Sequence, residues 1–155
     1  MKLASGIAPI TEFLRQGINV ALGTDSAASN NRLDIMGEMR LAGLLAKVAS
    51  GNPASVPAAV ALRMATLNGA AALGLDAHTG SLEAGKQADL VAVDMSGLGT
   101  SPMYDPVSHI AYAAGRECVT DVWVSGERVV ADRRLTTIDE AALVARARAW
   151  QQQLA

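Results

Sequence analysis

The sequence predicts an α/β protein in which a single buried strand is followed by several helices, a small β unit and a terminal helix. Three patterns indicate this order: a β-branched run at 18–22, helical periodicity over 31–73, and short alternating runs between 90 and 130. Hydrophobic residues make up 50% of the 155 residues and charged residues 18%. This composition allows a sizeable core and excludes a disordered chain.

The first two elements are a short helix and the strand. Residues 6–17 read as the helix, with Pro9 in its first turn and Gly17 as its stop signal. The run Ile18–Leu22 is rich in β-branched residues and ends in a polar turn at Thr24–Asp25. We expect a buried parallel-type strand, which requires hydrogen-bonding neighbours on both sides. The nearby sequence offers no such neighbour, so the chain resembles the last part of something larger.

Helical patterns occupy the next stretch. Asn31 is the expected N-cap of a helix, and the apolar stripe of that helix is Leu41, Leu44, Leu45 and Val48. Pro57 opens a further helix that Asn68–Gly69 interrupts, with Val60, Met64 and Leu67 on one face. A short turn at 70–73 completes the helical part.

A β unit and a last helix follow. Leu90–Val93 reads as a strand, 97–106 as a loop, and 119–124 with 128–130 as a hairpin across Ser125–Gly126. The pattern Thr-x-x-Glu at 137–140 predicts a capping box at the start of the terminal helix. The expected apolar stripe of that helix is Leu143, Ala147, Trp150 and Leu154.

Charge and cysteine content exclude several classes of function. The formal charge is −2, from 13 basic and 15 acidic residues, and the basic residues form no stripe, so nucleic-acid binding is not expected. A single cysteine excludes an internal disulfide and suits a reducing compartment. We find no signal peptide and no apolar run of membrane-spanning length. The chain is therefore expected to be cytoplasmic, without a membrane or nucleic-acid partner.

Asp25 is the residue best placed for chemistry. It stands where the predicted strand ends, and the carboxyl ends of barrel strands are where active sites form. A carboxylate there can ligate a metal and accept a proton from water; the structural alternative is an Asx-turn with Ser26. His78 is expected to be solvated in a turn, His109 to be a hydrogen-bonded structural histidine, and Cys118 to be a small buried hydrophobe. Two scattered histidines cannot complete a zinc site.

Several segments resemble one enzyme family. The stretch Gly-x-Leu-x-x-Gly-Lys-x-Ala-Asp-Leu at 80–90 is similar to a pattern found across the amidohydrolase superfamily. Lys-Leu-Ala-Ser-Gly at 2–6 and Ser-Asn-Asn at 29–31 resemble the branch of methylthioadenosine/S-adenosylhomocysteine deaminases and triazine chlorohydrolases. Further matching segments are 20–31, 65–74, 104–109 and 122–126.

The resemblance implies a fold and a site. The chain would be the C-terminal fragment of a (β/α)₈ TIM-type metal-dependent hydrolase barrel, with the last strand and helices in 1–75, part of a composite β-sandwich in 76–136, and a C-terminal helix in 137–155. Asp25 would end the eighth strand, ligate one divalent metal (zinc, or alternatively iron), contact the substrate and carry the proton from water to the leaving amine. Lys2 to Pro9 would border the substrate pocket.

The implied function is hydrolytic deamination of a purine nucleoside or related N-heterocycle. The family's other metal ligands and its catalytic glutamate have no counterpart in this sequence, so the chain alone is expected to be inactive and to hold no metal. A triazine-type chlorohydrolase or other aminohydrolase fragment, a non-catalytic assembly module, and half of a split enzyme remain alternatives. The expected partners are a small-molecule substrate and either a second copy or the missing N-terminal portion.

Overall fold

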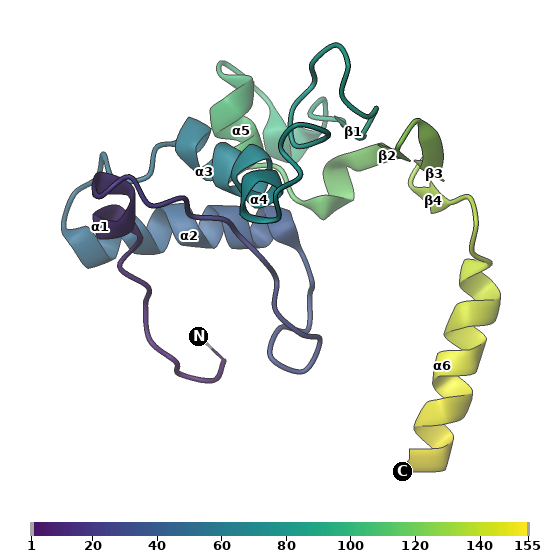
Figure 1. Ribbon diagram of the computed structural model, residues 1–155. Helices are drawn as coiled ribbons and strands as arrows, with labels where there is room; N and C mark the ends of the chain where they lie inside the picture. Colours follow the sequence, from purple (N-terminus) through teal and green to yellow (C-terminus); the bar gives the residue numbers. More distant parts are fainter. Residues whose placement is uncertain (1, 155) are drawn as a thin grey trace.

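Helices come first in the chain, and a sheet follows with one further helix between its first two strands. The computed structural model describes residues 2–154. Figure 1 shows the helices gathered on one side, the sheet beside them, and the last helix projecting away from both. The helices are α1 (Ile10–Arg15), α2 (Ile35–Ser50), α3 (Ala58–Ala65), α4 (Leu67–Ala72), α5 (Pro106–Tyr112) and α6 (Glu140–Leu154). The strands are β1 (Leu90–Val93), β2 (Val119–Val124), β3 (Glu127–Ala131) and β4 (Arg134–Leu135).

The N-cap of α2 differs from the predicted one. The side chain of Asp34, not that of Asn31, accepts hydrogen bonds from the backbone N–H groups of Met36 and Gly37. This carboxylate satisfies two of the four N–H groups that a helix start leaves unpaired. Gly51 ends the helix in the left-handed conformation with φ +64°.

The buried face of α2 is not the leucine stripe. The buried residues of α2 are Met39, Ala42, Gly43 and Ala46, whereas Leu44 is 47% exposed and Val48 is 79% exposed. Small side chains on this face allow α3 and α5 to approach closely, and the core forms between these helices. The predicted stripe was therefore wrong, because close helix packing selects the small-residue face.

The helical pattern after Pro57 is confirmed, but its break lies elsewhere. Thr66, with φ −129° and ψ −98°, separates α3 from α4. Asn68 and Gly69 lie inside α4 and do not interrupt it. Met64 is fully buried in the core, as its predicted face requires.

Residues 18–22 are extended but form no strand. Exposure alternates from Val20 onward, with Val20 and Leu22 half-buried against the helical core and Ala21 exposed. A strand is defined by backbone hydrogen bonds to a neighbouring strand, and the part of the chain that the structure describes supplies none here. The predicted strand is thus present as an extended segment, without the backbone hydrogen bonds to a neighbouring strand that would make it a β-strand.

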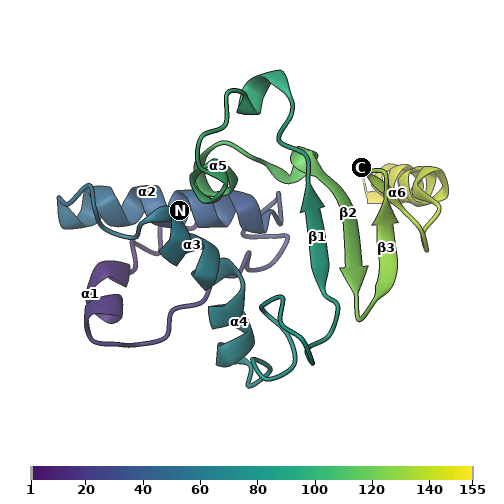
Figure 2. The same ribbon diagram turned by 90° about the horizontal axis from the view of Figure 1, so that it is seen from above.

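The predicted hairpin is confirmed within a four-stranded antiparallel sheet of order β1-β2-β3-β4. Figure 2 shows β1, β2 and β3 side by side next to the helices. Leu90 pairs with Trp123, and Val124 pairs with Glu127 across the turn. Ser125 (φ +51°) and Gly126 (φ +85°) both have positive φ, as a two-residue hairpin turn of this kind requires.

The terminal helix lies apart from the rest of the protein. Asp139, rather than Thr137, provides its cap by accepting from the N–H of Ala142, so the predicted capping box was wrong in detail. The predicted stripe is exposed; Trp150, for example, is 63% exposed. Within residues 2–154, no helix is both long and apolar enough to span a membrane.

Candidate active site at Asp25

The segment 18–25 presents Asp25 at its end. Ala21, Gly23 and Asp25 all lie on the exposed side of this extended segment, while Leu22 packs on the core. Asp25 adopts φ +60°, in the left-handed region that aspartate tolerates better than most residues. The chain turns at this point, and the carboxylate remains accessible.

Two neighbours stabilise the charged form of Asp25. The hydroxyl of Ser29 donates to Oδ2 of Asp25 at 2.5 Å, and the backbone N–H of Ser26 also interacts with the carboxylate. The Ser29 hydroxyl first, and the Ser26 N–H second, hold the pKa of Asp25 below its ordinary value. The side chain is therefore an anion at neutral pH, which is the form that ligates a metal or accepts a proton.

Lys2 connects the first residues of the chain to the loop that follows Asp25. Its Nζ donates to the carbonyl oxygen of Ala28 at 2.9 Å and to Oδ1 of Asn31 at 2.7 Å. The two segments singled out by the deaminase-like motifs are thus in direct contact. Neither Lys2 nor Ser29 follows from periodicity, although both lie in the segments that resemble the deaminase branch.

The other candidate residues do not join Asp25. The ring nitrogens of His109 face the carbonyl oxygens of Asp105 and Pro102 at 3.2 and 3.1 Å, which confirms a hydrogen-bonded histidine. His78 is exposed in a turn, as expected. Cys118 is only half-buried, so its prediction as a buried hydrophobe was wrong. Residues 2–154 contain no group of three or more His, Cys, Asp or Glu side chains that could hold a metal.

Asp25 fits the role of one metal ligand, because it is exposed and anionic. A catalytic zinc requires about three protein ligands. Among the described residues, Asp25 could therefore be one ligand of such a site, and the other ligands would have to come from elsewhere.

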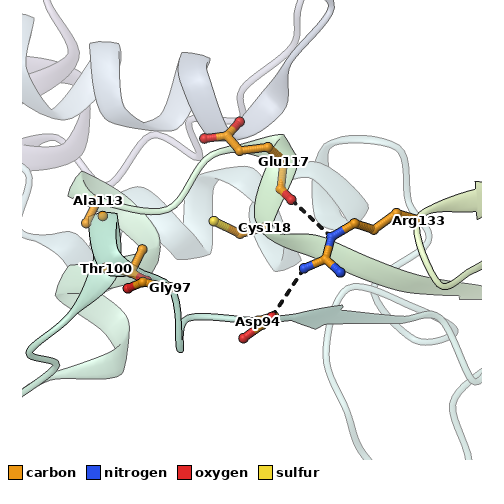
Figure 3. A pocket seen from close by; sticks show the side chains of 8 residues that line it. Asp94, Gly97, Thr100, Ala113, Glu117, Cys118 and Arg133 are labelled. Atoms are coloured by element: carbon orange, nitrogen blue, oxygen red, sulfur yellow. Dashed lines mark hydrogen bonds and ion pairs between the residues drawn. The ribbon is translucent and has the colours of Figure 1, made fainter.

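A separate hollow of about 300 Å³ lies at the end of β1, lined by Asp94, Gly97, Gly99, Thr100, Ala113, Glu117, Cys118 and Arg133. Figure 3 shows the guanidinium of Arg133 reaching toward Asp94 and Glu117. Arg133 pairs with Asp94 at 3.2 Å and donates to the carbonyl oxygen of Glu117 at 3.5 Å. Ser96, and then Arg133, lower the pKa of Asp94. The hollow thus contains an ion pair that joins β1 to the β3–β4 turn.

Comparison with known proteins agrees with the sequence motifs. The model of the amidohydrolase family matches residues 1–129. A 5-methylthioadenosine/S-adenosylhomocysteine deaminase of Teredinibacter turnerae is 47% identical over 154 residues, covering 99% of this chain and 35% of that protein. A 5'-deoxyadenosine deaminase of Methanosarcina acetivorans is 45% identical, with the same coverage of 99% and 35%.

Solved structures of related enzymes share the fold. An adenosine deaminase from Xanthomonas campestris with bound Zn superposes with a TM-score of 0.95 at 49% identity, covering 98% of this chain and 35% of that one. An atrazine chlorohydrolase from Arthrobacter aurescens complexed with zinc gives a TM-score of 0.85 at 33% identity, covering 93% of this chain and 32% of that one.

Helices beside a small antiparallel sheet make this a mixed α/β chain. The chain belongs to the amidohydrolase family. It spans about a third of the length of the relatives it matches.

Proposed function

We propose that this chain supplies the Asp25 carboxylate to a metal-dependent amidohydrolase that hydrolytically deaminates a purine nucleoside of the methylthioadenosine or S-adenosylhomocysteine type. The observation that carries the proposal is the exposed, anionic Asp25 at the end of an extended segment. The names of the relatives, which are deaminases of adenosine derivatives, support the substrate class.

Asp25 would ligate the metal through its carboxylate and act as the proton carrier. A divalent metal, zinc by analogy with the related solved structures, supplies Lewis-acid chemistry that lowers the pKa of water toward neutrality. Asp25 would accept the proton of the attacking water and deliver it to the amine that leaves. The reaction adds water and releases ammonia, so Asp25 ends each turnover in its initial state.

The residues around Asp25 would orient it. The hydrogen bond from Ser29 fixes one carboxylate oxygen and favours the anion. Lys2 holds the loop after Asp25 through Ala28 and Asn31, so the two segments that border the pocket would move as one unit. The substrate would contact Asp25 from its exposed side.

The test is reconstitution. The chain is joined in frame to the upstream two thirds of the Teredinibacter deaminase, and zinc content and ammonia release from 5'-methylthioadenosine are measured. We expect neither turnover nor stoichiometric zinc for the chain alone, and both for the fusion.

Substitution of the carboxylate in the fusion then tests its role. Asp25→Asn should lower kcat by about 10²–10⁴-fold, the usual contribution of a general acid–base. Asp76→Asn, which changes an exposed turn carboxylate, is the matched control and should leave kcat unchanged. An Asp25→Asn fusion as active as its parent would refute the proposal.

A triazine-type chlorohydrolase is the second candidate, and the related atrazine chlorohydrolase favours it. Release of chloride from atrazine by the same fusion, without deamination, would select it. Turnover of neither substrate would favour a non-catalytic assembly module. Co-purification of a second polypeptide carrying His-x-His would indicate a split enzyme.

We also propose that the chain associates with a second copy or with the missing portion of the barrel. The exposed Leu44 and Val48 on α2 support this, because large exposed apolar faces favour association.

A further inference from the structure

Asn68 in α4 and the extended segment before Asp25 exchange hydrogen bonds in both directions. The side-chain Nδ2 of Asn68 donates to the carbonyl oxygen of Val20 at 2.9 Å. The side-chain Nδ2 of Asn19 donates to the carbonyl oxygen of Asn68 at 3.0 Å. These residues are 48 and 49 positions apart, so the pair fixes one part of the fold relative to another.

A third hydrogen bond, between backbone groups, also joins the extended segment to the helices. The backbone N–H of Leu22 donates to the carbonyl oxygen of Met64 at 3.1 Å. Met64 lies in the last turn of α3, which Thr66 terminates, and the last carbonyl groups of a helix lack partners within the helix. The break between α3 and α4 therefore makes this acceptor available to the extended segment.

Together the three bonds do locally what a neighbouring strand would do. The segment 18–22 pairs with no strand in the described structure, yet Val20 and Leu22 pack against the helical core. Apolar packing by itself is not directional and permits sliding along the segment. The hydrogen bonds from Asn68 and to Met64 fix the positions of the Val20 carbonyl and the Leu22 N–H relative to the helices.

We propose that Asn68 is a positioning residue, which sets where the Asp25 carboxylate lies by holding the backbone of Val20. This inference rests on the proposed function of Asp25. Asp25 lies three positions after Leu22, and the left-handed turn at Asp25 follows that anchored peptide. An alanine at position 68 would leave the Val20 carbonyl without this donor.

The first experiment is amide hydrogen exchange by NMR on the full 155-residue chain, with no substrate or metal. Asn68→Ala removes the hydrogen bond to the Val20 carbonyl, so the segment should open more readily and the Leu22 amide should exchange about tenfold faster. The amide signals of 19–26 should also shift. Exchange of the Ala46 amide in α2 should not change.

Controls distinguish positioning from a general loss of stability. Asn52→Ala removes a comparable turn bond, from the N–H of Ala54, and should leave Leu22 unaffected. Asn19→Ala removes only the hydrogen bond from the Asn19 side chain to the Asn68 carbonyl oxygen and should give a smaller change at the same amides. Because Asn19 is exposed, this variant keeps the test available even if Asn68→Ala fails to fold. Equal acceleration at Leu22 and Ala46, or none at Leu22, would overturn the proposal.

The second experiment uses the fusion described above. Asn68→Ala should lower kcat at least tenfold with little change in KM, because the carboxylate is displaced while the substrate pocket remains. If the exchange result holds but kcat is unchanged, Asn68 is structural and does not position Asp25. If the parent fusion is itself inactive, the proposed function fails, whereas the exchange experiment still tests whether Asn68 anchors the segment.

Discussion

The ammonium group of Lys47 lies 2.9 Å from the carbonyl oxygen of Val56, a buried β-branched residue with φ +45°. A positive φ at a β-branched residue is rare and costs on the order of 1–3 kcal/mol. Lys47 also donates to the carbonyl of Ser55 at 2.7 Å and to the hydroxyl of Tyr112 at 3.1 Å. One charged group thus stabilises the strained turn that connects α2 to α3.

We therefore expect Lys47→Met to lower the free energy of unfolding by about 2–3 kcal/mol, because partly buried carbonyl groups lose a charged donor. Urea denaturation followed by circular dichroism measures this. The control is Arg15→Ala, which breaks an exposed ion pair with Glu12 and should lower the free energy of unfolding far less than Lys47→Met does. Equal losses in the two variants would contradict the interpretation of Lys47.

Gly80 and Gly74 provide a matched pair for steric effects. Both have positive φ, at +88° and +70°. A Cβ on Gly80 would lie 2.7 Å from the Cβ of Ala70, whereas a Cβ on Gly74 would meet nothing within 4 Å. Gly74→Ala should lower the free energy of unfolding by about 1 kcal/mol, from backbone strain alone. Gly80→Ala should lower the free energy of unfolding by about 1–3 kcal/mol more, because the backbone of α4 must also move. Thermal or urea unfolding of both variants checks the difference.

Asp89 should make the stability of the sheet depend on pH. Its Oδ1 accepts from the N–H of Ser125 at 2.6 Å and its Oδ2 from the hydroxyl of Thr79 at 2.5 Å. The Ser125 N–H first, then the Thr79 hydroxyl, lower the pKa of Asp89. A carboxyl whose pKa is lower in the folded state stabilises the fold above its unfolded pKa of about 3.9, and this contribution disappears as the pH falls through the folded value.

Asp89→Asn should accordingly be less stable than the parent chain at pH 6, and the difference should shrink as the pH falls below the ordinary pKa of an aspartate. Urea midpoints at several pH values measure it. Asp76→Asn, at an exposed turn, serves as the comparison and should leave the midpoint at pH 6 unchanged. A difference between Asp89→Asn and its parent that stays constant with pH would show that the lost hydrogen bonds do not depend on the carboxylate charge.

The exposed side chains of Leu44 and Val48 on α2 predict self-association of the isolated chain. Leu44→Glu together with Val48→Glu should shift light scattering toward the monomer mass without lowering the unfolding free energy, because both side chains are exposed within one copy. Lys47, between them, points toward Ser55 and Tyr112 and is left unchanged. A monomeric parent chain would contradict the expectation.

Local patterns were sufficient for several elements. The hairpin at Ser125–Gly126 was predictable, since a two-residue turn between alternating runs is a short-range signal. The exposure of Asp25 at a turn also followed from its place after an apolar run. The helix over 35–50 was expected, but its buried face was not, because α2 carries both a leucine stripe and a small-residue face. Only the approach of α3 and α5 selects between them.

The sequence alone therefore determined the helices before the sheet, the hairpin, the membership of the amidohydrolase family and the choice of Asp25 as the candidate ligand. These depend on residues close together in the chain or on motif spacing. The tertiary structure decided that Asn68 holds Val20, that Lys2 meets Asn31, and that 18–22 is extended without strand pairing. Contacts between residues far apart in sequence depend on how packed elements meet in space, and local preference does not encode that arrangement.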